Sequence, residues 1–250
     1  MVLDSLKAET LMTKTRTYLQ VWVGLGFLFT AMAIHLNLQG APIDYQQGEN
    51  ARILYVHVPA AWISILLYLI AATQTLGFLV TKHPFCLRAS TTALQVGSLF
   101  TALTLVTGAF RGKPMWGTLW VWDARLTSVV ILFGIYLAAL AFQRVSVELS
   151  SIFICIGSLD IPIIKFSVNW WSTLHQVGSI SRFDTSIHLS MLIPILVTFA
   201  NLLMTAAIAF VLETRLQLLA FRESALEEAI ESGDYQSSIL QHLSELPVTE

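Results

Sequence analysis

The sequence predicts an all-α integral membrane protein, a bundle of six transmembrane helices. Hydrophobic residues make up 55% of the 250-residue chain and charged residues only 12%, whereas soluble domains carry roughly 25% charged residues. Six apolar segments also come close to the roughly 20 residues that cross a bilayer as a helix. A bilayer selects this pattern, because a charge in hydrocarbon is costly and the spanning backbone must satisfy its own hydrogen bonds.

The six expected spans follow one another along most of the chain. They cover, in order, residues 18–36, 54–80, 91–110, 126–142, 152–168 and 187–212. The fifth is the weakest, because Asp160, Pro162 and Lys165 interrupt it. We interpret the first as a retained helix, since its apolar stretch is longer than the roughly 7–15 residues of a signal sequence.

Three parts are expected along the chain: an N-terminal segment at residues 1–17, a membrane domain at 18–212 and a polar, acidic tail at 213–250. Half of the 16 acidic residues lie at or after Glu213, and residues 213–231 are predicted to form an amphipathic helix. Six spans place both termini on one side. Eight of the 14 Lys and Arg residues fall on that side, which favours termini in the cytoplasm or matrix.

Several function classes are excluded by the sequence. Cys86 and Cys155 form neither C-x-x-C nor C-x-x-C-H, so a thiol oxidoreductase or a c-type cytochrome is not expected. There is no basic patch of the kind that nucleic acid requires. There is also no G-x-x-x-x-G-K-[ST] motif, so any ATP hydrolysis belongs to a partner. We expect a protein that is not an enzyme and that contacts the lipid bilayer rather than nucleic acid.

The most informative motif is the loop at residues 111–125, which holds Trp116, Trp120 and Trp122. Tryptophan favours the membrane interface in any case, so an aromatic belt is the simplest explanation. Three indoles bunched within a short loop favour instead a flat, apolar platform. Charged side chains flank them, namely Arg111, Lys113, Asp123 and Arg125. Cations beside such a platform suit haem, whose planar face carries two acidic propionates that arginine can bind.

Haem iron also takes axial ligands, for which imidazole is well suited. The expected topology places four histidines on the side of the tryptophan loop, namely His35, His57, His175 and His188, and it places His83 and His242 on the other. Residue chemistry leaves the choice among these four open, and for any one of them an interfacial hydrogen-bonding role is the simpler explanation. Met115 is a further, weak candidate ligand. Asp160, an acid within the fifth span, is either functional or paired with another charge.

Several motifs, in order along the chain, resemble the cytochrome c maturation protein C family, also called haem exporter protein C. They are DYQQG at 44–48, YVHVPAA at 55–61, GKPMW at 112–116, WGTLWVWDARLTS at 116–128 and NWWSTLHQ at 169–176. The resemblance extends from residue 41 to about 213. The segments at 179–188 and 210–215 look closest to mitochondrial members from plants.

The resemblance implies that His57 and His175 are the axial pair and that the tryptophan loop stacks on the haem. It implies haem b as a transiently bound cargo at the outer face of the mitochondrial inner membrane, toward the intermembrane space, or of a bacterial plasma membrane. A haem chaperone would take this cargo for c-type cytochrome assembly. The other implied partners are an ABC-type ATPase complex and its small membrane subunit. No role for Asp160 follows.

Three other functions stay open. A b-type cytochrome subunit of a respiratory complex would bury its haem between helices, whereas the candidate histidines lie at helix ends or in loops. A transporter of haem or another solute would place polar groups and broken helices near the midplane, where only Asp160 and Pro162 lie. A structural subunit would carry its tryptophans merely as a belt.

Overall fold

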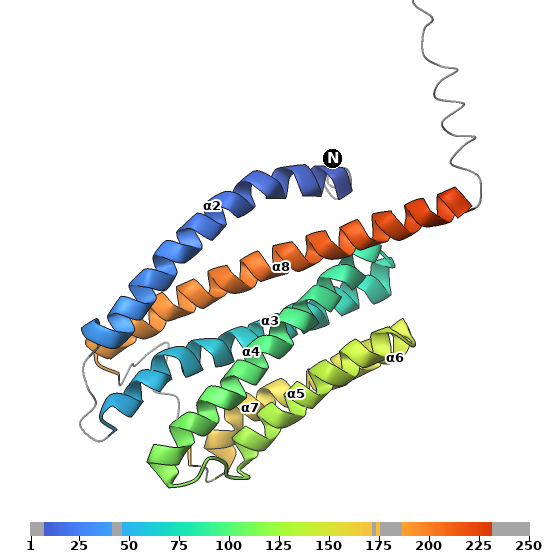
Figure 1. Ribbon diagram of the computed structural model, residues 1–250. Coiled ribbons are helices and arrows are strands. Elements are labelled where there is room, and N and C mark those ends of the chain that lie inside the picture. Colours follow the sequence, from blue (N-terminus) through green and yellow to red (C-terminus); the bar gives the residue numbers. More distant parts are fainter. Residues whose placement is uncertain (1–7, 42–46, 172–173, 176–186, 232–250) are drawn as a thin grey trace, which may run out of the picture.

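The computed structural model describes residues 8–41, 47–171, 174–175 and 187–231, which form a bundle of long helices (Figure 1). The helices are α2 (Ala8–His35), α3 (Leu54–Thr81), α4 (Pro84–Trp116), α5 (Ala124–Gln143), α6 (Val147–Gly157), α7 (Asp160–Trp170) and α8 (Leu189–Glu231), with the short π-helix η1 (Leu36–Gly40) and 3₁₀-helix η2 (Glu49–Ile53). Within the described residues, six helical segments are long and apolar enough to cross a membrane. The predicted all-α membrane bundle is therefore confirmed.

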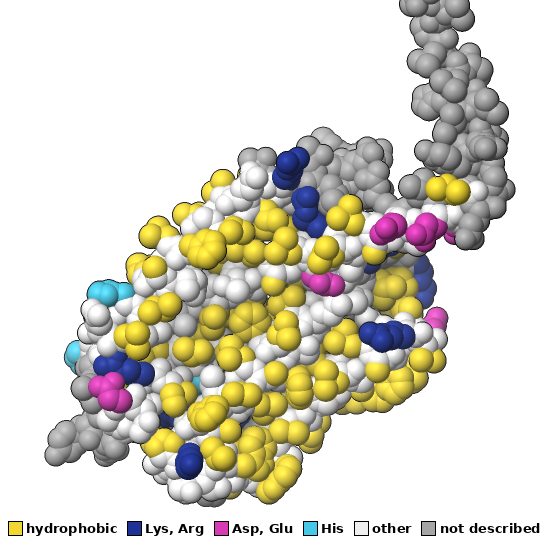
Figure 2. Space-filling model, viewed as in Figure 1, with side chains coloured by type: hydrophobic (Ala, Val, Ile, Leu, Met, Phe, Trp, Pro, Cys, Tyr) yellow, Lys and Arg dark blue, Asp and Glu magenta, His cyan; other side chains and the backbone are white. Residues whose placement is uncertain are grey.

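Helices α3 and α4 form the centre of the bundle (Figure 1). On one side α8 packs against α3, and α2 packs mainly against α8; on the other side α5 joins α4 to α6 and α7. We call the end where α2, α4 and α7 finish and α3, α5 and α8 begin the loop end. On the face in Figure 2 apolar side chains cover the flank of the helices, and the visible histidines gather near the loop end.

Polar contacts hold α2 onto α8 within this apolar surrounding. The Thr30 hydroxyl donates a hydrogen bond of 2.9 Å to Asn201 Oδ1, and the Asn37 amide donates one of 3.0 Å to Thr198 Oγ1. Lipid tails are as apolar as leucine, so helices in a bilayer associate through close packing and such interhelical hydrogen bonds. These two bonds fix α2 beside α8 although few of its side chains are buried.

The fifth span is built from two 11-residue helices, α6 and α7, which meet at Ser158 and Leu159. Pro162 is the third residue of α7, where its missing N–H removes no helical hydrogen bond. Asp160 opens α7 and is buried, with 8% of its surface exposed. The predicted interruption of this span is therefore a break between two helices that together still have the length to cross.

Two tyrosines join the centre of the bundle to the α5–α7 side. Tyr68 and Tyr136 are fully buried and meet edge to face with ring centroids 5.1 Å apart. Their hydroxyls donate 2.7 Å hydrogen bonds to the carbonyl oxygens of Ile154 and Ser64 respectively. Gly97 on α4 lies directly against the Tyr136 ring. Fully satisfied polar contacts of this kind fix one arrangement of neighbouring helices.

The last helix continues well past the expected end of the sixth span. Residues 213–231, predicted as a helix, extend α8 without a break, and the Gln217 amide donates a 3.0 Å hydrogen bond to Gln95 Oε1 on α4. Residues 232–250, the rest of the expected tail, lie outside the described residues. Because the helix crosses position 212 unbroken, the division into membrane domain and tail stays a proposal.

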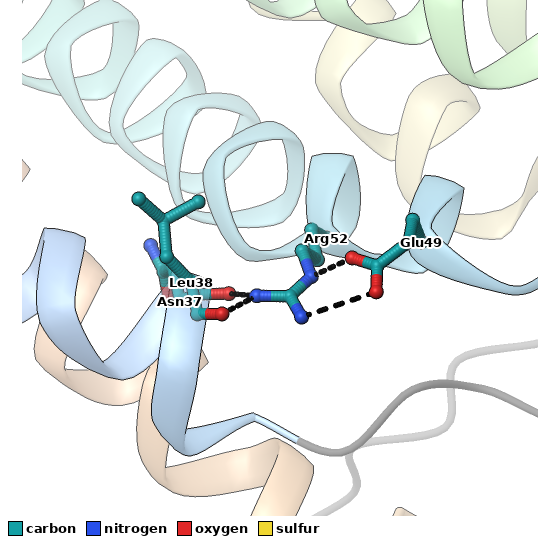
Figure 3. A network of polar contacts seen from close by, with 4 residues as sticks. All are labelled: Asn37, Leu38, Glu49 and Arg52. Atoms are coloured by element: carbon teal, nitrogen blue, oxygen red, sulfur yellow. Dashed lines mark hydrogen bonds and ion pairs between the residues drawn. The ribbon is translucent and has the colours of Figure 1, made fainter.

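At the loop end, Arg52 joins η2 to the end of α2 and η1 (Figure 3). Its guanidinium donates a 2.8 Å hydrogen bond to the carbonyl oxygen of Asn37 and another to that of Leu38, and it pairs with Glu49. These carbonyls lie where a helix ends and lack helical donors. The Arg52 side chain thus joins segments of the fold at the loop end.

We predict that Arg52→Met lowers the free energy of unfolding by about 2 kcal/mol, because charge-assisted hydrogen bonds to otherwise unsatisfied carbonyls are lost. Reversible unfolding in mixed micelles measures this change. The exposed Arg144, at the opposite end, gives a matched control: Arg144→Met is expected to change stability by less than about 0.5 kcal/mol. Equal effects of the two substitutions would contradict the assigned role of Arg52.

Candidate functional site

The candidate site lies at the loop end and takes residues from four stretches of the chain. His57 belongs to the first turn of α3, and α4 passes beside it at Thr107 and Gly108. Asp123 immediately precedes α5, and His175 follows α7. The two candidate imidazoles lie within electrostatic range of each other.

The His57 ring packs directly on α4. A β-carbon at Gly108 would lie 3.0 Å from His57 Cε1, so the glycine permits this close approach. His57 Nδ1 lies 3.1 Å from Thr107 Oγ1. Neither Thr107 nor Gly108 was predicted as a site residue, because threonine and glycine are ordinary packing residues of membrane helices and only the spatial contact distinguishes them.

The second imidazole faces a carboxylate. His175 Nδ1 lies 3.6 Å from Asp123 Oδ2, and the Asp123 side chain is only 6% exposed. Burial lowers the pKa of the His175 imidazole below its ordinary value, and the nearby Arg125 guanidinium lowers it further, whereas the Asp123 carboxylate opposes both effects. The ring is therefore neutral near neutral pH, which is the form that binds a metal.

Asp123 also caps a helix. Its Oδ1 accepts a 2.7 Å hydrogen bond from the backbone N–H of Leu126, and its backbone is extended, as is usual for an N-cap. One carboxylate oxygen thus fixes the start of α5 and the other faces His175. The same residue ties the second imidazole to a rigid element.

Two other histidines are held differently. His188 is exposed, and its Nδ1 accepts a 3.3 Å hydrogen bond from the Ser190 N–H at the start of α8. His83 Nδ1 likewise accepts from the Phe85 N–H at 3.2 Å, and it lies at the opposite end of the bundle. His35 is exposed at the end of α2, and His242 lies outside the described residues.

The three indoles of the tryptophan loop do not form one flat platform in this structure. Trp116 packs beside His175, with ring centroids 5.4 Å apart and a tilt of 59°. Trp120 and Trp122 meet at 77°, with centroids 5.6 Å apart, because aromatic quadrupoles favour an edge-to-face contact. Trp122 is 76% exposed. Of the three indoles, that of Trp122 is therefore the one most open to a ligand.

The cations of the loop differ in their surroundings. Arg125 Nε donates a 3.3 Å hydrogen bond to the carbonyl oxygen of Ile164, which ties α5 to α7. Arg111 is partly buried and lies within electrostatic range of His175. Lys113 is exposed and lines a cavity of about 660 Å³ with Asn50, Ile53, Thr107, Phe110 and Pro114. Met115 is also exposed, and no described contact gives it a role.

The second tryptophan motif lies only partly within the described residues. Trp170 stacks on Phe166, with centroids 5.6 Å apart, and meets Trp171 edge to face; both indoles are more than half exposed. Residues 172–173 and 176–186 lie outside the described residues, as do residues 44–46 of the first motif. This part of the site is therefore described only as far as Trp171 and at Leu174 and His175.

These residues fit haem. Two imidazoles, one on α3 and one after α7, lie within electrostatic range of each other, and both have their Nδ1 atoms on the protein side. Trp122 is an exposed indole, a group that stacks well on planar ligands, and Arg111 and Lys113 are cations of the kind that bind carboxylates. The buried indole nitrogen Trp120 Nε1 has no hydrogen-bond partner among the described residues. Its N–H can therefore donate a hydrogen bond to a ligand.

Comparison with known proteins agrees with this fit. The sequence profile described as Heme exporter protein C matches residues 2–229 of the chain.

The chain belongs to the Heme exporter protein C family.

Proteins similar to this chain come from plants and bacteria. The chain is 62% identical over 234 residues to a cytochrome c biosynthesis ccmC-like mitochondrial protein of Arabidopsis thaliana, covering 94% of this chain and 91% of the relative. A protein of the same description from Marchantia polymorpha is 61% identical over 204 residues, covering 82% and 90%. Heme exporter protein C of Bradyrhizobium diazoefficiens is 42% identical over 200 residues, covering 77% and 73%. The predicted family and its likeness to mitochondrial plant members are thereby confirmed.

Proposed function

We propose that this protein binds haem b transiently at the loop end of its bundle and delivers it to a haem chaperone for c-type cytochrome assembly. The observation that carries this proposal is the pair His57, on α3, and His175, after α7, each with Nδ1 toward a protein oxygen. The names of the family and its relatives support a role in haem handling and cytochrome c biosynthesis.

The chain's own residues divide the work of holding this cargo. His57 and His175 supply axial nitrogens to the iron, and Asp123 orients the second imidazole. The exposed indole of Trp122 contacts the porphyrin. Trp116 packs beside His175, and Trp120 packs against Trp122. The propionates meet the cations Arg111 and Lys113, and Arg125 holds α7 in place through Ile164. An open site at a membrane face suits release to a partner better than permanent storage.

The cellular setting is part of the proposal. The relatives named as mitochondrial support placing the chain in the mitochondrial inner membrane, with both termini in the matrix and the loop end toward the intermembrane space. The proposed partners are the haem chaperone, an ABC-type ATPase complex and its small membrane subunit. The role is one of assembly, with no catalysis assigned to this chain. Residues 1–17, 18–212 and 213–250 are its proposed parts.

Transport is the second candidate function. The broken fifth span favours it, because Asp160 is buried where α6 and α7 meet and transporters place polar groups at such breaks. The candidate imidazoles lie instead at helix ends on one face, which favours presentation over passage. A b-type cytochrome subunit is disfavoured for the same reason.

A titration of the purified protein with haem in detergent tests the proposal. We predict that Trp122→Ala weakens haem binding about tenfold, which corresponds to about 1.4 kcal/mol, because the exposed indole no longer contacts the porphyrin. Trp22→Ala, at another exposed tryptophan but on α2, is the matched control and should bind as wild type does. Unchanged haem affinity in Trp122→Ala, or equal losses of affinity in both variants, would favour the alternative in which these tryptophans only form an aromatic belt at the membrane interface.

A second prediction separates the two roles of Asp123. Asp123→Ser keeps a good N-cap but loses the carboxylate beside His175, so haem affinity should fall about 10–100-fold with stability near wild type. Asp123→Ala should lose that affinity and about 1 kcal/mol of stability as well. Haem titration and thermal unfolding in detergent measure both quantities. A serine variant that binds haem as tightly as wild type would contradict the orienting role.

A further inference from the structure

The Thr107 hydroxyl donates its proton to a backbone carbonyl of its own helix and not to His57. Thr107 Oγ1 donates to the carbonyl oxygen of Leu103 at 2.7 Å and lies 3.2 Å from that of Thr104. Both carbonyls can only accept, and a hydroxyl has a single proton. Two oxygens 2.7 Å apart need that proton between them. Toward His57, whose Nδ1 lies 3.1 Å away, the Thr107 hydroxyl therefore acts as an acceptor.

This assignment determines which nitrogen of His57 carries the proton. A neutral imidazole has one donor and one acceptor nitrogen, so a hydrogen bond to Thr107 Oγ1 places the proton on Nδ1. Nε2 is then left with its lone pair, as an iron ligand requires.

The contact with α4 also fixes how the ring is turned. Gly108 allows the His57 Cε1 edge to lie against the helix, where an ideal β-carbon would be 3.0 Å away. His188 provides a contrast within the same chain: its Nδ1 accepts from a backbone N–H, so its proton is on Nε2. Nε2 therefore carries the proton in His188, whereas Nε2 is unprotonated in His57.

We propose that Thr107 is a positioning residue that holds His57 in the Nδ1–H tautomer, with Nε2 ready to bind haem iron. The role in binding iron rests on the proposed function, whereas the tautomer itself follows from the contacts of Thr107 alone. Thr107 acts on His57 as Asp123 does on His175. The two axial ligands therefore have partners of different charge, one hydroxyl and one carboxylate. Such outer partners orient metal-bound histidines and raise their basicity.

The tautomer can be measured without haem. Nitrogen NMR of the full chain in detergent, with ¹⁵N-labelled histidine and His57 assigned by comparison with His57→Gln, distinguishes a protonated from a bare ring nitrogen. We expect a protonated Nδ1 and a bare Nε2 at His57. The reverse assignment would overturn the inference while leaving the proposed haem function untouched.

Haem binding supplies the second readout. Thr107→Val, nearly isosteric but without an acceptor, should bind haem about tenfold more weakly, the low end of the range for such outer partners. It should also raise the midpoint potential of the bound haem, since a less basic imidazole stabilises ferric iron less. Thr107→Ser should restore both values. Thr91→Val, on the same helix with its hydroxyl bonded to Leu87, controls for losing a threonine.

The outcomes are distinguishable. Wild-type affinity and potential in Thr107→Val, or equal changes in Thr91→Val, would overturn the role of Thr107 while haem binding stands. A wild-type protein that takes up no added haem would overturn the proposed function and, with it, this role of Thr107. A valine variant that changes both values, together with serine rescue, would establish it.

Discussion

Replacing either His57 or His175 by alanine is expected to weaken haem binding more than about 100-fold. Loss of a hydrogen-bond partner behind a ligand costs about 10–100-fold, and loss of the ligand itself should cost more. Haem titration in detergent measures the change. Added imidazole should restore a six-coordinate spectrum in each variant, because the lost side chain leaves space beside an intact site; an unfolded variant would show no such rescue.

Two histidines of the same chain serve as controls for this prediction. His188 and His83 use Nδ1 as an acceptor for backbone N–H groups at helix starts, so His188→Ala and His83→Ala should lose some helix capping but no haem affinity. If His188→Ala abolished binding while His57→Ala and His175→Ala retained it, the axial pair would be misassigned.

A large loss of stability is expected when Gly97 is replaced by alanine. An added β-carbon would lie 2.4 Å from Tyr136 Oη and 2.6 Å from Cε1, which is far inside contact distance. The ring has little freedom to move, since it is fully buried and its hydroxyl donates to Ser64. Overpacking of this kind costs about 1–3 kcal/mol, so Gly97→Ala should lower the free energy of unfolding by that amount in mixed micelles.

Gly134 provides the matched control for Gly97. It also lies within a membrane-spanning helix, α5, but a β-carbon there would meet no atom within 4 Å. Gly134→Ala should be neutral or stabilise by up to about 1 kcal/mol, because alanine favours helix more than glycine does. Similar losses in the two variants would indicate that glycine itself, rather than contact with Tyr136, sets the effect.

The bundle was predictable because hydrophobic length is a one-dimensional property of the sequence. The structure adds helix ends that composition does not register: α4 continues to Trp116, beyond the expected end at residue 110, because the polar stretch with Arg111 and Lys113 remains helical. The break before Asp160 was visible as an interruption. Its form, two helices meeting at Ser158 and Leu159, depends on packing against neighbours.

The candidate site was only partly readable from the sequence. The resemblance selected His57 and His175, and the structure brings both rings to the same end of the bundle. Thr107 and Gly108 could not be found, since they lie about 50 residues from His57 in the chain and no motif marks them. Nor could the sequence reveal that Arg125 donates to the α7 backbone or that Trp120 and Trp122 meet edge to face.

The most direct test of haem binding by two imidazoles is a spectroscopic one. Purified full-length protein would be loaded with haem in detergent, and its visible and electron paramagnetic resonance spectra would be recorded in the ferric state. We predict a six-coordinate, low-spin haem with two imidazole nitrogens as axial ligands. A five-coordinate, high-spin spectrum, or no retention of added haem, would contradict the assignment of His57 and His175 as the axial pair.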